Sequence, residues 1–345
     1  MRQQRTILAV LALLFLVFML SCAGGAKKIE QSKKPEKLAP QMKVTGESRL
    51  LLGTLKEMGD YVNSSDFPAL IRASEVYNEL DGDIHIIDLR GEATFADGHI
   101  KGAVNVAFPD LPEYFRNSIN PADFDKIVLV CYSGQITSYA TSLLRLLGYQ
   151  NVYAMLWGMS SWNSYFAESQ WLDALSSEYE NALETTVHEK AAPGSLPVLN
   201  TRKNSGDEIL RERIDSLFAA GHYDALISAG SVFEHPDNYY IINYDGEDKY
   251  KSGHVPGAIH FQPGETIGVV AEMQKIPANS SVVLYCNTGH SSGFATAYLR
   301  LLGYNAATIT YGSNSFMYHK MKTEATKLSW VLFGESEIHD YPYVK

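Results

Sequence analysis

Two cysteines lie in segments of the same design, Cys131 in residues 127–137 and Cys286 in residues 282–292. In each segment a short apolar run ends at the cysteine and a glycine follows three residues later, and beyond the segment leucines recur at helical spacing, at 143–147 and 299–302. An unbroken run this short is typical of a strand buried on both faces of a parallel sheet. We therefore expect each cysteine between a strand end and a helix N-terminus, where backbone N–H groups and the helix dipole stabilise an anion.

A single cysteine at a strand end is more often an ordinary buried residue than a reactive one. The repetition of the same cysteine, glycine and hydroxyl spacing favours two reactive-thiol loops. Cys131 and Cys286 are thus the candidate catalytic residues. The candidate substrate-binding residues are those that follow each cysteine, namely Tyr132, Ser133, Gly134, Gln135, Ile136 and Thr137, and Asn287, Thr288, Gly289, His290, Ser291 and Ser292.

The repeat extends well beyond the cysteines. His99 and His254 are separated by 254 − 99 = 155 positions, and Cys131 and Cys286 by 286 − 131 = 155. The segment Arg-Leu-Leu-Gly-Tyr recurs at the same offset, at 145–149 and 300–304. A constant offset between separated landmarks indicates a duplicated domain of ordinary size.

The order of these motifs resembles the rhodanese family. In the first copy Ile86-Ile87-Asp88-Leu89-Arg90 precedes Gly98-His99-Ile100-Lys101-Gly102-Ala103, the Cys131 loop and Trp157-Gly158-Met159-Ser160-Ser161-Trp162. The second copy is similar but ends in a weaker Tyr311-Gly312. The resemblance implies an α/β fold with two rhodanese-like domains, each a central parallel sheet of about five strands with helices on both faces.

The resemblance also implies a chemistry. Loops with six residues after the cysteine resemble the sulfurtransferase branch of the family, in which the cysteine carries sulfane sulfur as a persulfide. The implied partners are a small sulfane-sulfur donor and a thiol acceptor, with no cofactor and no metal. Gly134 and Gly289 are expected to let the loop backbone curl, and Thr137 and Ser292 to cap the following helices.

The loops depart from relatives that use thiosulfate, because those carry arginine or lysine beside the loop. The first loop has no cation and the second offers only His290. We therefore expect thiosulfate not to be the preferred donor. The same absence supports an alternative class of function, in which the rhodanese-like domains are non-catalytic docking units of a cell-envelope complex, such as a redox complex.

The charges that flank the loops distinguish the two cysteines. Asp88 and Arg90 end a strand beside the first loop and are candidate supporting residues, whereas Asn243 and Asp245 hold these positions in the second copy. A nearby positive charge favours a thiolate and a negative one disfavours it, so Cys131 is predicted to be the main sulfur carrier. His99 and His254 are expected to be structural.

The N-terminus predicts export. Residues 1–21 have a basic start and a short apolar run, and Cys22 follows directly, as in a bacterial lipoprotein that is acylated on cysteine. Residues 22–48 form a polar tether that is too poor in apolar residues to fold. We therefore expect a membrane-anchored envelope lipoprotein, in the outer membrane and on its periplasmic or surface face.

The rest of the chain divides into domain 1 at 49–172, a linker at 173–207 that is helical as far as His188, and domain 2 at 208–345 with a C-terminal tail packed on it. The net charge of −10 disfavours binding to nucleic acid. A further envelope protein is an expected partner.

Overall fold

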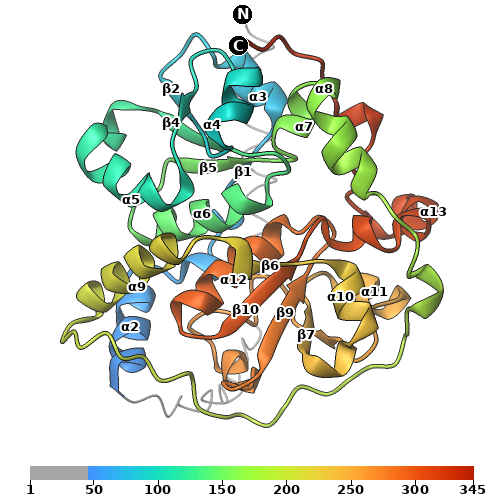
Figure 1. Cartoon of the computed structure of the whole chain (residues 1–345). Helices are drawn as coiled ribbons and strands as arrows, with labels where there is room; N and C mark the ends of the chain where they lie inside the picture. Colours follow the sequence, from blue (N-terminus) through green and yellow to red (C-terminus); the bar gives the residue numbers. More distant parts are fainter. Residues whose placement is uncertain (1–45) are drawn as a thin grey trace, which may run out of the picture. The chain divides into compact units, whose positions relative to one another are not determined.

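The computed structural model describes residues 46–345 and contains two sheets of the same topology (Figure 1). The strand order is β1-β5-β4-β2-β3 in the first sheet and β6-β10-β9-β7-β8 in the second, and all strand pairs are parallel. We call the part around the first sheet the first domain and the part around the second sheet the second domain. Helices surround both sheets, so the predicted pair of rhodanese-like α/β domains is confirmed.

The five strands of the first domain are β1 (Leu70–Ile71), β2 (Ile84–Asp88), β3 (Val104–Asn105), β4 (Lys126–Val130) and β5 (Val152–Met155). Its helices are α3 (Ala73–Asn78), α4 (Glu92–Asp97), α5 (Leu111–Glu113), α6 (Gln135–Leu146), α7 (Met159–Trp162) and α8 (Ser164–Ala167). In the second domain the strands are β6 (Leu226–Ile227), β7 (Tyr240–Asn243), β8 (Ile259–His260), β9 (Ser281–Tyr285) and β10 (Asn305–Ile309). Its helices are α9 (Gly206–Ala220), α10 (Ala229–Glu234), α11 (Glu247–Ser252), α12 (His290–Leu301) and α13 (Tyr318–Leu328).

The two domains pack through the helices that follow the cysteines. Residues of α6 and α12 share one buried apolar cluster, and the Ser142 hydroxyl of α6 donates to the Phe294 carbonyl of α12 at 2.9 Å. Both helices are buried along nearly their whole length because a sheet covers one side and the opposite helix covers the other. The cysteine loops at their N-termini therefore lie close to the boundary between the domains.

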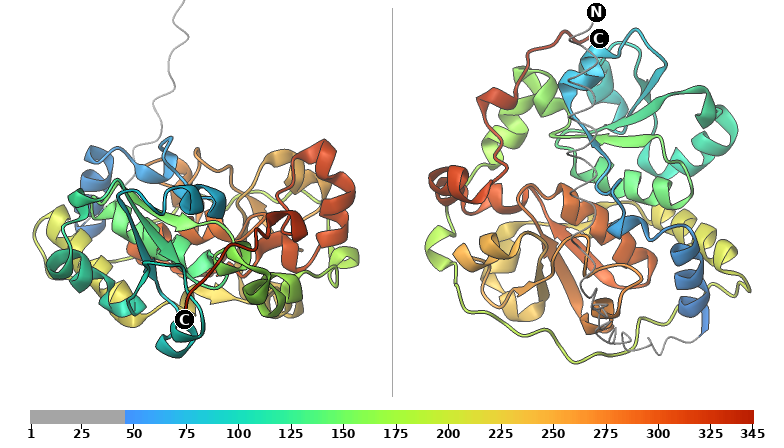
Figure 2. Two further views of the ribbon diagram at one scale, coloured as in Figure 1. Left: turned by 90° about the horizontal axis from the view of Figure 1, so that it is seen from above. Right: turned by 180° about the vertical axis from the view of Figure 1, so that it is seen from behind.

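Helix α2 (Gly46–Glu57) belongs to this arrangement although it precedes the first sheet. Its buried side chains Leu51, Leu52 and Leu55 join the same apolar cluster as Ile209 and Ile214 of α9. The two helices lie side by side in Figure 1 and in the rear view of Figure 2. The predicted tether to residue 48 thus ends earlier, since the helix begins at Gly46, and residues 22–45 lie outside the described part.

Two connecting segments depart from the predictions. The linker is irregular between a short 3-10 turn at Glu180–Ala182 and α9, so the predicted helix to His188 is wrong. The C-terminal tail, residues 329–345, does not end on the second domain but reaches the first (Figure 1). There Tyr341 donates its backbone N–H to the Trp162 carbonyl at 2.8 Å, and Val344 pairs with His99 as an antiparallel bridge.

The tail is held on this path by backbone hydrogen bonds and by aromatic contacts with the first domain. Tyr341 stacks on Tyr77 with ring centroids 4.0 Å apart, and Tyr343 packs edge-on against Phe166 at 5.0 Å. Such aromatic contacts add to the free energy of burial. Among residues 46–345, no helix has both the length and the apolar character needed to cross a membrane.

Candidate active site: two cysteine loops

The first cysteine loop, Cys131–Thr137, connects the buried strand β4 to α6. Gly134 ends the turn with φ 90° and ψ −12°, and α6 begins at Gln135. This left-handed conformation favours glycine. A Cβ atom at Gly134 would also lie 2.4 Å from Nε2 of His290 and 2.9 Å from the Met155 carbonyl oxygen, so only glycine fits without displacing its neighbours. The predicted role of Gly134 in curling the backbone agrees with this geometry.

The sulfur of Cys131 lies inside the curl of this loop. Its Sγ is 3.2 Å from the backbone nitrogen of Gly134, which donates to it, and 3.7 Å from Oγ1 of Thr137. The side chain of Cys131 is buried, with 1% of the residue exposed. Donors fixed at a sulfur in this way can stabilise negative charge on it without reorganising.

The second cysteine loop, Cys286–Ser292, has the same backbone plan with different donors. Gly289 has φ 76°, and α12 begins at His290. Cys286 Sγ accepts hydrogen bonds from the Ser292 backbone N–H at 3.5 Å and from its hydroxyl at 3.4 Å. The residue is 4% exposed. Both thiols are therefore buried and contact donors at the start of the following helix, from Gly134 directly before α6 and from Ser292 in the first turn of α12.

Thr137 and Ser292 do not cap their helices, which corrects the prediction. Each helix begins earlier, after Gly134 or Gly289, and neither glycine position carries a side-chain cap. The Thr137 hydroxyl donates instead to the Gly134 carbonyl at 3.0 Å. Both hydroxyl groups remain beside the sulfur because they lie in the first turn of the helix, on the side that faces the loop.

The supporting pair beside the first loop forms a buried ion pair. The Arg90 guanidinium donates to Asp88 at 2.7, 3.0 and 3.1 Å and to the Gly98 carbonyl at 2.7 Å. Arg90 and Asp88 are 2% and 1% exposed. Arg90 is also 5.8 Å from the centroid of the Tyr132 ring, so it lies near the loop while its charge is balanced by Asp88.

The second loop has a carboxylate in this place. Asp245 Oδ2 accepts the backbone N–H of Asn287 at 3.0 Å, and its Oδ1 pairs with Lys249 at 2.9 Å. One amide of the second loop is therefore bonded to a carboxylate. Lys249 balances the charge of this carboxylate, as Arg90 balances that of Asp88, and the order of the two thiols stays a prediction.

The side chain that follows each loop glycine contacts the cysteine loop of the opposite domain. His290, which the sequence assigned to the second loop, reaches the first, where its Nε2 accepts the Trp157 backbone N–H at 3.3 Å. Gln135 of the first loop reaches the second, where its amide donates to the Thr288 carbonyl at 3.0 Å. Each loop is thus completed by a side chain from the other domain.

His290 is neutral in this position. Its Nδ1 donates to the Thr288 hydroxyl at 2.9 Å, and its ring stacks parallel to Trp171 at 6.0 Å and edge-on to Trp157 at 5.5 Å. Complete burial lowers the pKa of His290 to about 3. The one candidate cation of the loops therefore supplies no positive charge at neutral pH.

Several residues of the site were not predicted from the sequence. Gly158 has φ 58°, and a Cβ there would lie 2.4 Å from the Cys131 carbonyl oxygen and 2.8 Å from the Ser133 nitrogen. Gly312 has the same relation to the second loop, with a Cβ 2.2 Å from the Cys286 carbonyl oxygen. Trp171 donates its Nε1–H to the Ser133 carbonyl at 2.9 Å. The aromatic–glycine pair that ends both copies, at 157–158 and 311–312, is the sequence feature that could have identified this part of the site.

The chain belongs to the rhodanese-like domain family, because the model of that family matches residues 72–165 and 220–318, more than half of the chain. A tRNA uridine(34) hydroxylase of Teredinibacter turnerae is 29% identical over 105 residues, which are 30% of this chain and 30% of that protein. The chain thus matches less than one third of that relative.

Two solved structures illustrate the likeness. A rhodanese-related protein of Thermoplasma volcanium is 22% identical, with 29% of this chain and 90% of that chain covered and a TM-score of 0.24. A thiosulfate sulfurtransferase of Pseudomonas aeruginosa is 16% identical, with 75% of this chain and 46% of that chain covered and a TM-score of 0.28.

Proposed function

We propose that the protein is a rhodanese-type sulfurtransferase that carries sulfane sulfur on Cys131, with Cys286 as a second carrier. The observation that supports this proposal is the position of each thiol beside hydrogen-bond donors at the start of the following helix. Cys131 faces the N–H of Gly134, directly before α6, and Cys286 faces the N–H and hydroxyl of Ser292 in the first turn of α12. The family membership agrees with it. The same donors would stabilise the terminal sulfur of a persulfide.

The proposed reaction has two displacements. The Cys131 thiolate attacks the outer sulfur of a donor R–S–SH, a new S–S bond forms, the donor S–S bond breaks, and R–S⁻ leaves with the electron pair. An acceptor thiolate then attacks the outer sulfur of the cysteine persulfide. It leaves as a new persulfide, and the Cys131 thiolate is restored, so that the complete cycle requires no external oxidant or reductant.

The donor in this proposal is a persulfide or polysulfide. The first loop contains no lysine or arginine, and Arg90, which lies 5.8 Å from the ring centroid of Tyr132, is bound to Asp88. A sulfonate group would therefore lack the bidentate partner that arginine offers to oxyanions. Thiosulfate is accordingly proposed to be a poor donor.

Mass spectrometry of the two loop peptides tests this function. The full chain is incubated with glutathione persulfide, inorganic polysulfide or thiosulfate, and the peptides that contain Cys131 and Cys286 are analysed without reduction. We expect the mass of one sulfur atom to be added with the first two donors and little with thiosulfate. A thiol acceptor should remove it. Failure of every donor to add sulfur to either cysteine would contradict the proposal.

A docking function is the second candidate, and the burial of both thiols favours it. Cys131 and Cys286 are 1% and 4% exposed, and a side chain of the opposite domain packs against each loop glycine. Domains of this kind could bind a further envelope protein without turnover. Unmodified thiols in the experiment above, in chains that alkylate fully after denaturation, would support docking over catalysis.

We also propose that the protein is anchored to the cell envelope through Cys22. This residue lies outside the described part of the chain, so the proposal rests on the sequence of residues 1–22. The test is fractionation of cells that express Cys22→Ala. The variant should appear in the soluble fraction, and a variant that still sediments with membranes after a salt wash would contradict the anchor.

A further inference from the structure

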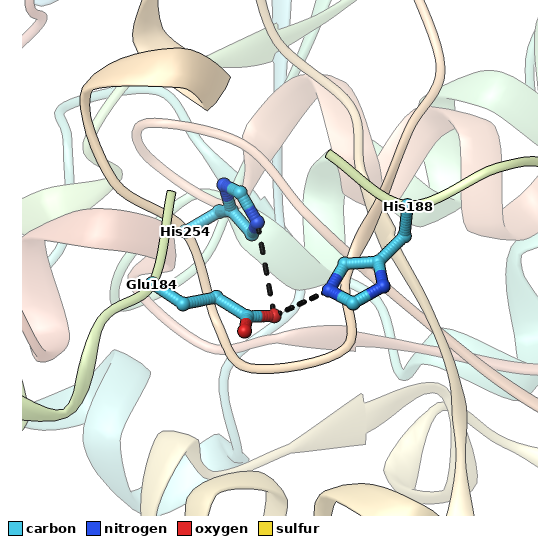
Figure 3. A group of neighbouring side chains, drawn as sticks. All are labelled: Glu184, His188 and His254. Atoms are coloured by element: carbon cyan, nitrogen blue, oxygen red, sulfur yellow. Dashed lines mark hydrogen bonds and ion pairs between the residues drawn. The ribbon is translucent and has the colours of Figure 1, made fainter. Parts of the chain in front are cut away.

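The linker joins the second domain at the turn that contains His254. Glu184 and His254 form an antiparallel bridge, with the Glu184 N–H donating to the His254 carbonyl at 3.0 Å and the His254 N–H donating to the Glu184 carbonyl at 2.9 Å. Residues that exchange both bonds in this way project their side chains from the same face. The bridge therefore places a carboxylate beside an imidazole (Figure 3).

His188 brings a second imidazole to the same place. Its Nε2 lies 2.7 Å from Oε1 of Glu184, and its backbone N–H donates to the Tyr250 hydroxyl at 3.1 Å. The Nε2 atom of His254 lies 3.8 Å from the same Glu184 oxygen. Figure 3 shows both rings directed toward the carboxylate. The three ligand atoms all lie within 4.8 Å of one another.

The His254 ring is held from three sides. Its Nδ1 is 2.7 Å from the Tyr250 carbonyl oxygen, its Nε2 is 3.0 Å from the Thr186 carbonyl oxygen, and it stacks on the Tyr250 ring at 3.8 Å. Carbonyl oxygens only accept, and a neutral imidazole has one N–H to give. With Nδ1–H donated to Tyr250, the Nε2 lone pair faces two oxygen atoms, those of Thr186 and Glu184.

A metal ion bound to Nε2 removes this conflict, because the lone pairs of Nε2 and of the two oxygen atoms can then all point to the ion. A metal ion can accept all the lone pairs that point to this place, whereas a proton can bridge only one pair of atoms. The Nδ1–H to carbonyl bond is the usual way in which a histidine ligand is oriented.

We propose that Glu184, His188 and His254 form a binding site for a divalent transition-metal ion of the Zn²⁺ class. Two imidazole nitrogens and one carboxylate oxygen are ligands that zinc accepts, with the fourth position left to water or to the Thr186 carbonyl. Ligand atoms at about 2.0–2.2 Å from zinc lie roughly 3.3 Å apart in a tetrahedron. The present separations of 2.7 and 3.8 Å lie on either side of that value.

The remaining contacts suit this role. Glu184 Oε1 also accepts the Gly257 backbone N–H at 2.5 Å, which fixes the carboxylate. The side chains of Glu184 and His188 are 28% and 35% exposed, so an ion can enter from solvent and the side chains can adjust. A bound ion would fasten the linker to the second domain, independently of sulfur transfer at the cysteine loops.

The first domain provides an internal contrast. His99 holds the position of His254, its Nδ1 is 2.8 Å from the Phe95 carbonyl oxygen, and its ring stacks on Phe95 at 3.7 Å. The residue paired with it is Val344 instead of a glutamate, and valine offers no ligand atom. The sequence did not indicate the site because Glu184 and His254 are 254 − 184 = 70 positions apart and form no spaced motif.

The test measures Zn²⁺ binding by the full chain, purified without a histidine tag and treated with a chelator. We expect one Zn²⁺ per chain, and we expect Glu184→Gln and His188→Ala each to weaken binding by more than about 100-fold in competition with a chromophoric chelator. The matched control is His319→Ala, which removes an exposed histidine that is paired only with Glu180, at 3.3 Å. This variant should bind like the unmodified chain.

Substitution with Co²⁺ separates this site from the cysteine loops. Bound Co²⁺ should show visible absorption of a tetrahedral or five-coordinate ion without the charge-transfer band of a thiolate ligand. A thiolate band would assign the ion to a cysteine and overturn the proposal. It would equally be overturned by no stoichiometric binding or by unchanged affinity in both variants.

Discussion

The two cysteine loops share a backbone and differ in what surrounds them. Each has a glycine in the left-handed region and a helix that begins directly after it. The first loop receives the imidazole of His290 and lies near the Arg90–Asp88 pair, whereas the second receives the amide of Gln135 and is bonded directly to Asp245, which Lys249 pairs. Duplication thus preserved the geometry that holds a sulfur, while the residues that set its electrostatics diverged.

The largest expected effect concerns which thiol carries sulfur. Cys131→Ser should lower sulfur uptake from polysulfide by more than about 10-fold, and Cys286→Ser by less than about 2-fold, because a carboxylate bonded to the second loop disfavours an anion there. Uptake is measured as persulfide per chain by mass spectrometry. Asp245→Asn should raise the share carried by Cys286, with the neighbouring substitution Asp248→Asn as control. A larger loss in Cys286→Ser than in Cys131→Ser would reverse the comparison.

The flanking charges should also differ in what they contribute to stability. Arg90→Gln leaves Asp88 charged, buried and unpaired, so it should lower the free energy of unfolding by about 3–5 kcal/mol. Asp245→Asn keeps an acceptor for the Asn287 N–H and should cost less than about 2 kcal/mol. Urea denaturation measures both values. Equal losses would show that the two pairs are energetically alike.

Alanine at the loop glycine should also lower the free energy of unfolding more in the first loop than in the second. Gly134→Ala places a Cβ 2.4 Å from His290 Nε2 and should cost about 2–4 kcal/mol, whereas the closest atom at Gly289 is 3.0 Å away and Gly289→Ala should cost about 1–2 kcal/mol. Gly102, with φ 84° and open space around it, is the control for backbone strain alone. Adding His290→Ala to Gly134→Ala should recover part of the loss. No recovery would mean that His290 is not the obstacle.

The smallest expected effect concerns the pH dependence of the free energy of unfolding. Burial lowers the pKa of His290 to about 3, while the unfolded chain has a histidine pKa of about 6.5. The unfolded state therefore binds more protons below pH 6.5, and His290 makes stability fall on acidification by up to about 1.4 kcal/mol per pH unit. His290→Gln, which copies the residue at position 135, should lose this part of the slope. Denaturation at several pH values from 7 to 5 checks it.

The control for this measurement is His235→Gln, since His235 is exposed. Its slope should match that of the unmodified protein. An unchanged slope in His290→Gln would indicate that position 290 is protonated in the folded protein near neutral pH, and would remove the electrostatic contrast between the loops.

The sequence was sufficient to predict the two sheets and the place of each cysteine. The runs at 127–130 and 282–285 are apolar because both faces of β4 and β9 are covered, and a fully covered strand has a recognisable composition. The glycine three residues after each cysteine is required by the left-handed backbone conformation at that position. Features that depend on the chain within a few residues were therefore accessible.

Features that depend on distant segments were not. His290 and Gln135 appear in the sequence as members of their own loops, and only the packing of α6 on α12 directs each to the other domain. The aromatic residues of the C-terminal tail suit either domain by composition. Backbone hydrogen bonds to His99 and Trp162 hold them on the first domain, and no local sequence pattern predicts these bonds.

The segment that follows each domain pairs with the other domain. The linker after the first domain pairs with His254 of the second, and the tail after the second domain pairs with His99 of the first. Neither half of the chain therefore contains all of the backbone that completes its own histidine turn. Loosening of one half withdraws bonding partners from the other, so the tandem is expected to unfold in a single cooperative transition, and either half expressed by itself would expose an unpaired edge.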